Sequence, residues 1–555
     1  MNAKRLLCTA ISTLLILLTG AAFAQPVRQL FRQNPFSRSR NVCGMGIDPT
    51  VYTCGTDSDP LVVSSASLYS GIEQGDFRPG HGSSSLWKMG AEAQTEGYFR
   101  KTFMTGSFSF EELHGKDMRM SMFINPGYYP IDVMEFTPGD KTLQTYRFSG
   151  GIAHELSDGW RLGGKIDFAS QNYAKRKDIR HTNYALDLTI MPSILYRGLD
   201  SRFGLSGIFR KTSESIEAEQ VGAATADTYY AFFDKGMRYG TYQAWDGSGI
   251  HLAEAGVSRL PVREFSYGAA VQYAYVGGLY VDAEYLRTDG LVGERGYDWY
   301  RFPGHRLAGN LRWSHLTPFH YDYGFLTLHF DWRGQRLEEA AWDKVTDGGI
   351  TLPEVYGYNT VYRRRQTNLS ADYQILFRDH TLRSVQLGYS ATIWDEQASP
   401  QYPYTDCWHI WMSRLNANIV TGLPFGGIAR RFTLALGARY FWANDRERGL
   451  EPVIPSEGSS VISSEVEKSP SIVMPDLIGH LQPASEPYRL NFEWVRRHEY
   501  LTASGMSLNG ALTYRIKSVQ GLSLTLAGSW THAFEITLLK GKNRWTSSLR
   551  LGYDF

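Results

Sequence analysis

The sequence predicts an all-β protein: a single transmembrane antiparallel up-and-down β-barrel of about 18 strands, with 14 or 16 strands as alternatives. Three observations support this prediction. Apolar and polar residues alternate along many long segments. The connections between these segments are alternately short and long. After residue 24, no stretch approaches the 18 or more apolar residues that indicate a membrane-spanning helix.

The first residues predict export from the cytoplasm. Lys4 and Arg5 precede an apolar run from Leu6 to Leu18, and the small residues Ala22 and Ala24 follow. This order is typical of a secretory signal peptide. The run is shorter than the ~20 residues of a spanning helix. We expect a signal peptide at residues 1–24, a periplasmic tail or small hatch at 25–60, and the barrel at 61–555.

Two cysteines near the N-terminus could form a disulfide or remain as free thiols. Cys43 and Cys54 flank a short segment rich in turn formers. Exported chains encounter oxidising conditions, so a disulfide between them fits, as do two unpaired thiols. Neither cysteine has the paired partners of a zinc site. We therefore expect no metal and no cofactor.

The alternation is strongest in four segments near 160, 326, 432 and 522. Around residue 326, Leu326, Leu328 and Phe330 lie on one predicted face, with His329 and Asp331 on the other. A soluble sandwich would also alternate, but here aromatic residues stand near the ends of the apolar faces, as expected at membrane interfaces. These residues are Trp160, Trp332, Trp442, Trp530 and Tyr553.

The connections sort into two classes. The expected strands begin near residues 61, 84, 99, 142, 160, 180, 202, 263, 279, 305, 321, 364, 382, 407, 429, 500, 520 and 542. If residue 555 lies in the periplasm, every short turn falls on the periplasmic side, where bacterial barrels carry their short turns. The short turns are 156–159, 197–201, 276–278, 317–320, 378–381, 422–427 and 517–521. The long connections include 113–141, 217–262, 337–363 and 444–499.

The last strand carries a further signal. Leu549, Leu551, Tyr553 and Phe555 alternate with polar residues up to the final position. This pattern resembles the C-terminal signal that outer-membrane assembly machinery recognises in its barrel clients. The resemblance implies that the barrel-assembly machinery is a partner.

Net charge, segment length and the positions of the histidines argue against several classes of function. Since the formal net charge is only +1, a nucleic-acid partner is not expected. The segment 25–60 is too short for the plug of a 22-stranded TonB-dependent receptor. The histidines are scattered, and no nucleophile, base and orienting group are found at one predicted rim. We expect no enzymatic activity, although a membrane enzyme remains the third hypothesis.

The predicted inner faces carry charges of both signs. Such residues either line a water-filled route or pair with one another and fill the lumen. The main hypothesis is a channel or transport-associated barrel for an unidentified solute. The alternative is a filled barrel that displays loops to a partner or to surface polysaccharide. The candidate lumen-lining residues are Arg161, Lys165, Asp167, Asp282, Glu284, Arg312, His329, Asp331, Arg333, Arg414, Arg439 and Arg550.

The whole chain resembles the large outer-membrane β-barrels of Bacteroidota that carry only a domain-of-unknown-function label. The residues behind the resemblance are the Gly- and aromatic-rich strands, SGIEQGDFRPGH at 70–81 and the final LRLGYDF. The resemblance implies an outer-membrane location and an accessory role in nutrient uptake, with a partner of that pathway. Outer-membrane lipid and lipopolysaccharide are the other expected partners, and Arg363 to Arg365 fall near the outer rim, close to anionic head groups.

Overall fold

The computed structural model describes most of the chain from Val62 to Phe555. The predicted signal peptide, the segment 25–60, and Cys43 and Cys54 lie outside the described residues. The described residues are 62–555 except 178, 220–228, 238, 246–249, 252–255, 258, 276–277, 295–296, 317–322, 348–349, 378–381, 399–403, 424–431, 453–495, 517–518 and 538.

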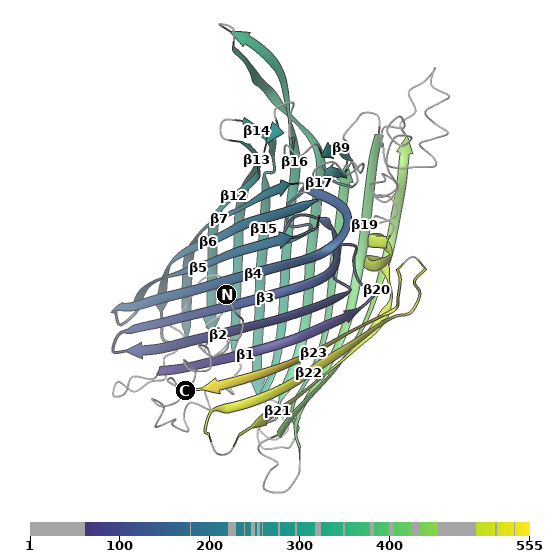
Figure 1. The fold of residues 1–555 in the computed structure, drawn as a ribbon. Helices are drawn as coiled ribbons and strands as arrows, with labels where there is room; N and C mark the ends of the chain where they lie inside the picture. Colours follow the sequence, from purple (N-terminus) through teal and green to yellow (C-terminus); the bar gives the residue numbers. More distant parts are fainter. Residues whose placement is uncertain are drawn as a thin grey trace.

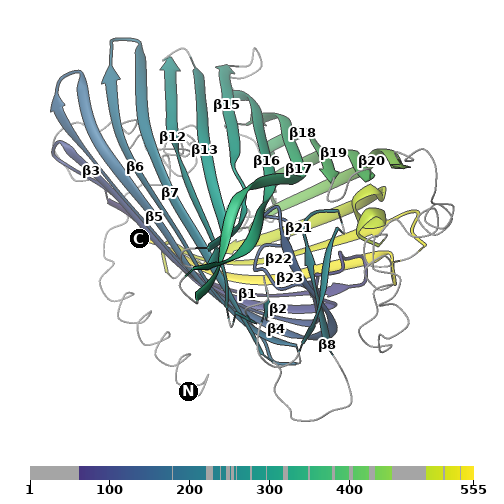
Figure 2. The ribbon, with the colours of Figure 1, turned by 90° about the horizontal axis from the view of Figure 1, so that it is seen from above.

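Within these residues, 18 antiparallel strands form a closed barrel, which confirms the predicted fold class. The ring closes because β1 pairs with β23, from Ser65 opposite Asp554 to Gly75 opposite Arg544. Figure 1 shows the two walls of the barrel, and Figure 2 shows it from above, with β8 beside β4. The barrel strands are β1 (Val62–Gly75), β2 (Ser85–Phe99), β3 (Thr102–Ser121), β4 (Asp132–Ser157), β5 (Trp160–Lys175), β6 (Arg180–Arg197), β7 (Ser201–Glu219), β12 (Arg259–Tyr275), β13 (Leu279–Glu294), β15 (Gly304–Leu316), β16 (Tyr323–Asp347), β17 (Ile350–Leu376), β18 (Leu382–Ala398), β19 (Tyr404–Gly422), β20 (Phe432–Pro452), β21 (Gly505–Arg515), β22 (Leu522–Ala533) and β23 (Asn543–Asp554).

Five shorter strands accompany the barrel. β8 (Tyr229–Asp234), β9 (Gly240–Trp245) and β14 (Tyr297–Arg301) join the main sheet, whereas β10 (Ile250–His251) and β11 (Gly256–Val257) pair with each other. β8 pairs with the first residues of β4, from Asp132 opposite Asp234 to Glu135 opposite Ala231. This pairing places the β8–β9 hairpin at the end of the barrel that carries the long connections.

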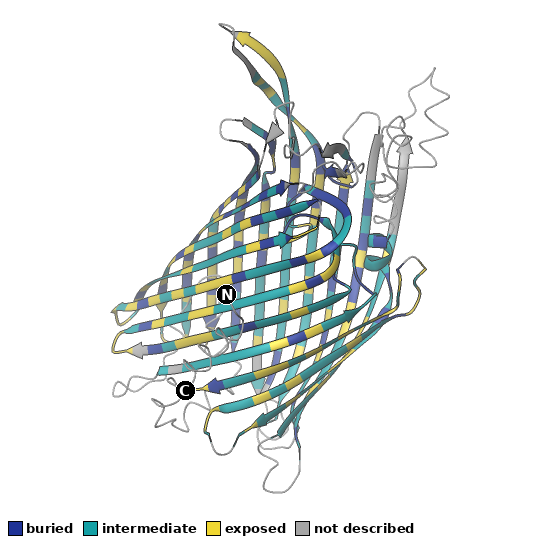
Figure 3. Cartoon of the chain, viewed as in Figure 1, coloured by how far each residue is buried: buried dark blue, intermediate teal, exposed yellow. Residues whose placement is uncertain are grey.

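The outer face of the barrel is apolar and exposed. On β5, Leu162 and Ile166 are 52% and 50% exposed, whereas Arg161, the residue before Leu162, is 5% exposed. Leu436 and Leu526 are also exposed on the outside, and Figure 3 shows exposed positions recurring along the strands. A leucine in a dry protein core would be buried, so these side chains face lipid.

The aromatic residues follow the prediction except at the last strand. Trp160 and Trp530 are exposed, and Trp332 and Trp442 are partly exposed. Tyr553 is buried, because its ring packs edge-on against Phe555 at a centroid distance of 4.6 Å. The Phe555 amide donates to the Ser64 carbonyl at 2.9 Å, so the terminal residue lies at the closing pair of strands.

Three long connections differ from the expectation. The connection expected at 113–141 spans only 122–131, because β3 extends to Ser121 and β4 begins at Asp132. The segment 337–363 is mostly strand, because β16 and β17 stay paired from Leu337 opposite Tyr362 out to Asp347 opposite Ile350. The strand expected near residue 500 begins only at Gly505, since residues 496–502 form a helix. In these places the strand alternation of the sequence weakens, so the strand boundaries were not visible from the sequence.

A closed sheet with an apolar outer surface is the arrangement by which strands cross a bilayer, since every backbone amide in lipid needs a partner. The protein is therefore a multi-pass β-barrel of the outer membrane. No helix in the described part of the chain combines the length and the apolarity needed to cross a bilayer.

The outward position of Leu436 gives a stability prediction. We expect Leu436→Arg to lower the free energy of unfolding from lipid vesicles by about 2–4 kcal/mol, because it places a charge among acyl chains. Thr433→Arg, on the opposite face of the same strand, is the control and should change stability far less. Equal losses for the two variants would contradict the assignment of the faces.

Candidate functional site

The segment between β3 and β4, residues 122–131, lies against the inner faces of other strands. The Asn183 side chain on β6 donates to the Met122 carbonyl at 2.8 Å. The Ile124 amide donates to Glu214 on β7 at 2.9 Å, and the Tyr128 hydroxyl donates to Glu264 on β12 at 2.8 Å. The segment thus crosses the lumen instead of extending outward.

Arg364 holds the far side of this segment. Its guanidinium donates to the backbone carbonyls of Gly127, Tyr128 and Tyr129, and also to Gln335 on β16. Arg364 is on β17, the ninth strand after β3 in the ring of 18, which is halfway round the barrel. A single buried side chain therefore ties the segment to the wall opposite its own strands.

Tyr128 lies among charged groups of the inner wall. Its ring centroid is 4.5 Å from the guanidinium of Arg333 and 5.8 Å from that of Arg210. Both contacts fit attraction between a cation and an aromatic face. Arg210 also forms a two-point ion pair with Asp187, at 2.7 and 3.0 Å. The tyrosine joins the segment to three strands at once.

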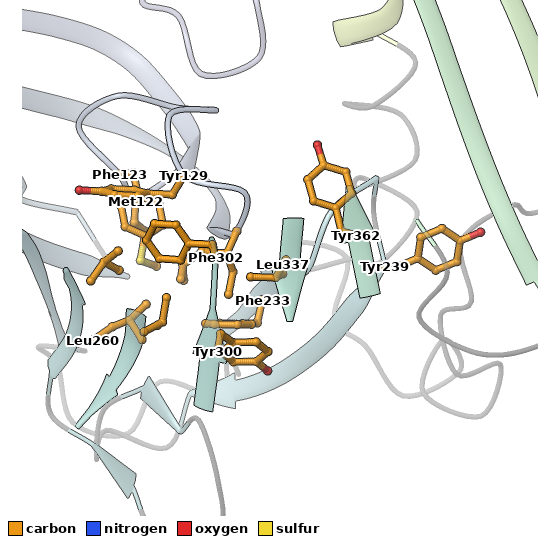
Figure 4. Packing of buried hydrophobic residues seen from close by; sticks show 14 of the residues in the cluster. Met122, Phe123, Tyr129, Phe233, Tyr239, Leu260, Tyr300, Phe302, Leu337 and Tyr362 are labelled. Carbon is orange, nitrogen blue, oxygen red and sulfur yellow. The ribbon is translucent and has the colours of Figure 1, made fainter. Parts of the chain in front are cut away.

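Residues 122–135 and the β8–β9 hairpin together form what we call the cap. It packs against the upper strand ends through one apolar cluster, which includes Met122, Phe123 and Phe233 from the cap and Leu260 and Phe302 from the wall (Figure 4). Burial of each such side chain contributes on the order of 1.5–3 kcal/mol. The cap is therefore a packed element of the fold.

Three buried charged groups fix the base of the cap. Glu135 accepts from Lys175 at 2.5 Å and lies 3.4 Å from the ammonium of Lys141, and all three side chains are at most 1% exposed. Lys141 also donates to the Ser121 carbonyl, and Lys175 to the Thr137 carbonyl. Removal of one partner from such a buried group costs about 3–5 kcal/mol.

Six of the predicted residues lie together on the inner wall beneath the cap, on β13, β15 and β16. Asn310 bridges Asp282 and His329, at 2.9 and 2.7 Å. Arg306 bridges Glu284 and Asp331, at 3.2 and 2.9 Å. In the same region, Arg333 lies 3.5 Å from Glu264, and Arg312 donates to Thr327 at 3.3 Å.

The other predicted residues lie on different parts of the inner wall. Arg161 and the pair Lys165–Asp167 are on β5, where Arg161 contacts Glu155 at 3.4 Å and Lys165 contacts Asp167 at 3.1 Å. Arg439 on β20 donates to Asn416 at 2.7 Å. Arg414 is on β19, and Arg550 on β23 contacts Glu92 at 3.3 Å. These residues lie apart from the six predicted residues on β13, β15 and β16, which we call the β13–β16 group.

Sequence reasoning missed the residues that hold the cap. Arg364 was grouped with its two neighbours at the outer rim, although strict alternation would have placed it on the inner face. Glu135, Tyr128 and Glu264 fell in or near connections, where alternation gives no signal. Within the described ranges, no group of three or more His, Cys, Asp or Glu side chains is placed to hold a metal ion.

Asp132 gives the cap a dependence on pH. Asp132 precedes the membrane-spanning part of β4. Burial raises the pKa of its carboxyl to about 7, and the nearby Asp234 acts in the same direction. Hydrogen bonds from Ser121 and the Val133 amide, and the charge of Arg497, act in the opposite direction.

Because the folded carboxyl binds its proton more tightly than the unfolded one, its contribution to stability falls as the pH rises from about 4 to about 7. We expect amide hydrogen exchange in residues 122–135 to be faster at pH 7.5 than at pH 5, after correction for intrinsic rates. The loss is at most about 1.4 kcal/mol per pH unit. Asp132→Asn should remove most of this difference, and an unchanged difference in that variant would contradict the assignment.

Several solved outer-membrane proteins are similar to this chain at low identity. The FrpB iron transporter from Neisseria meningitidis is 9% identical, with a TM-score of 0.44 over 92% of this chain and 83% of its own. The copper transporter OprC is 7% identical, with a TM-score of 0.39 over 90% and 81%. FpvA of P. aeruginosa, solved in complex with a heterologous pyoverdine and iron, is 9% identical, with a TM-score of 0.39 over 89% and 72%.

No curated protein matches the sequence significantly. One family model matches residues 56–555, which is nearly the whole chain. The chain therefore belongs to the family of unknown function DUF6850.

Proposed function

We propose that the protein is a transport-associated outer-membrane channel whose outer mouth is closed by the cap. The observation that supports this most is the path of residues 122–131, which cross the lumen and are held by Arg364 on the opposite wall. A solute would pass the cap only when these contacts are released.

The inner wall beneath the cap fits a polar or charged solute. The β13–β16 group presents Asp282, Glu284 and Asp331 together with Arg306 and His329. Charges of both signs in a water-filled route interact with a solute without strong selection for one sign of charge.

A partner of nutrient uptake fits the same proposal. The cap is held by hydrogen bonds and ion pairs as well as by apolar packing, so a partner that engages it would need to compensate for those contacts. We place such a partner at the long-connection end of the barrel, where the β16–β17 hairpin extends and Tyr356 is 65% exposed.

The second candidate function is a filled barrel that displays its loops. The size of the apolar cluster that joins the cap to the wall favours it. This candidate predicts that the barrel conducts no ions even after the cap is released. Conductance therefore separates the two functions.

Release of the cap should open the channel. In planar bilayers we expect low conductance for the unmodified protein and a severalfold increase for Arg364→Gln, which removes the bonds to the segment. Tyr128→Ala, which removes the contacts with Glu264 and Arg333, should act in the same direction. Arg365→Gln is the matched control, because that neighbouring side chain points outward, and it should leave the conductance unchanged.

Folding of each variant is checked by the heat-dependent shift in gel mobility that folded barrels show. If folded Arg364→Gln and Tyr128→Ala both conduct no more than the unmodified protein, the channel proposal is wrong. The filled barrel is then the better account.

A further inference from the structure

The outer faces of neighbouring strands change from apolar to cationic at the same end of the barrel. On β17, the outward side chains run from Leu369 through Thr367 to Arg365 and Arg363, and both arginines are exposed. On β13, Tyr285 is followed by the exposed Arg287. The change occurs within one or two outward positions on each strand, directly above the surface that faces acyl chains.

The two strands between β13 and β17 also carry basic or aromatic side chains at this level. On β15, the exposed Leu307 is followed outward by His305, which lies opposite Gly334 of β16. On β16, the indole of Trp332 lies over Gly334, where an added Cβ would approach the ring to 2.9 Å. Tryptophan rings of this kind lie at the level of lipid head groups. We call Arg287, His305, Arg336, Arg363 and Arg365 the arginine rim.

Positive charge exceeds negative charge on this rim. Arg287 lies 3.7 Å from Asp289, and Arg336 is paired with Glu338. Within the described residues, no carboxylate lies within ion-pair distance of Arg363 or Arg365. Asp395 of β18 lies directly opposite Arg365 in register, and its carboxylate contacts His409 instead.

Two arginines of the rim lie opposite each other across adjacent strands. Arg336 and Arg363 are directly opposite each other on adjacent strands. Side chains in that position are about 4.5–5.5 Å apart at Cβ, and like charges there destabilise a sheet. Arg365 is two residues from Arg363 on the same face, about 6–7 Å along the strand. Arg336, Arg363 and Arg365 therefore occupy neighbouring outward positions, close enough for one anionic group to contact more than one guanidinium.

We propose that the arginine rim binds the phosphate of an outer-leaflet glycolipid of the lipopolysaccharide type. Guanidinium groups bind phosphate through two parallel hydrogen bonds. Arginine side chains therefore favour a phosphate group over an uncharged sugar. The acyl chains of the same lipid lie against the outward leucines directly below the rim. This proposal is independent of the proposed channel, because the rim faces away from the lumen.

The experiment compares lipid retention in native mass spectrometry. The full protein in detergent is titrated with bisphosphorylated lipid A, with the fully dephosphorylated lipid, and with lipid A in the presence of excess inorganic phosphate. The variants are R363Q/R365Q, R363K/R365K and K101Q/R197Q. The last pair removes two exposed basic residues at the opposite end of the barrel and serves as the matched control.

We expect R363Q/R365Q to bind bisphosphorylated lipid A about tenfold more weakly than the unmodified protein, which corresponds to about 1.4 kcal/mol. R363K/R365K should retain part of the affinity, and K101Q/R197Q should retain all of it. The affinity of the unmodified protein for dephosphorylated lipid should be low. It should equal the affinity of R363Q/R365Q for bisphosphorylated lipid A.

Three outcomes would overturn the proposal. Equal binding of lipid A by the unmodified protein and by R363Q/R365Q would show that the rim takes no part. Equal binding of the phosphorylated and dephosphorylated lipids would show that the protein does not recognise the phosphate group. Complete displacement of lipid A by inorganic phosphate would show that the rim takes a small anion rather than a lipid.

Discussion

The structure depends on one constraint: a backbone amide in lipid must find its partner within the protein. A sheet satisfies this only when its first and last strands pair, and the pairing of β1 with β23 over Ser65 to Gly75 does so. Closure fixes one face of every strand toward lipid and the other toward the lumen. The apolar outer belt, the inner charges and the arginine rim all follow from this division.

The same constraint makes the lumen available to the cap. In an 18-stranded ring the inner faces lie far apart, so a single connection can enter and contact several of them. Residues 122–131 use this space, with backbone groups bonded to Asn183, Glu214 and Arg364. The buried Glu135–Lys141–Lys175 group and the apolar cluster then hold the cap in one position. The cap is the feature that distinguishes this barrel from an open ring.

Much of the barrel was predictable from the sequence, because a period of two determines the face of every residue in a paired strand. The expected starts near 160, 180, 279 and 382 agree with the observed strands to the residue. Arg161, Asp282, Arg333 and Arg439 all lie on the face opposite the exposed apolar residues, as alternation requires. Their part in transport stays a prediction.

The cap was not predictable, because alternation carries no information where the chain leaves the sheet. Nothing local in residues 122–131 indicates that they turn inward, and the contact between Tyr128 and Arg364 spans 236 positions. The helix at 496–502 and the burial of Tyr553 were missed for a related reason. Both depend on packing between distant segments rather than on the local pattern.

The central claim is that the segment after β3 is folded into the barrel, and thiol labelling of intact cells tests it most directly. Cysteine is introduced at Met122, which is 0% exposed, or at Tyr356, which is 65% exposed, in a chain without its native cysteines. Both positions lie at the long-connection end. A membrane-impermeant maleimide should label position 356 rapidly and position 122 only after denaturation. Rapid labelling at both positions in folded protein would contradict the account.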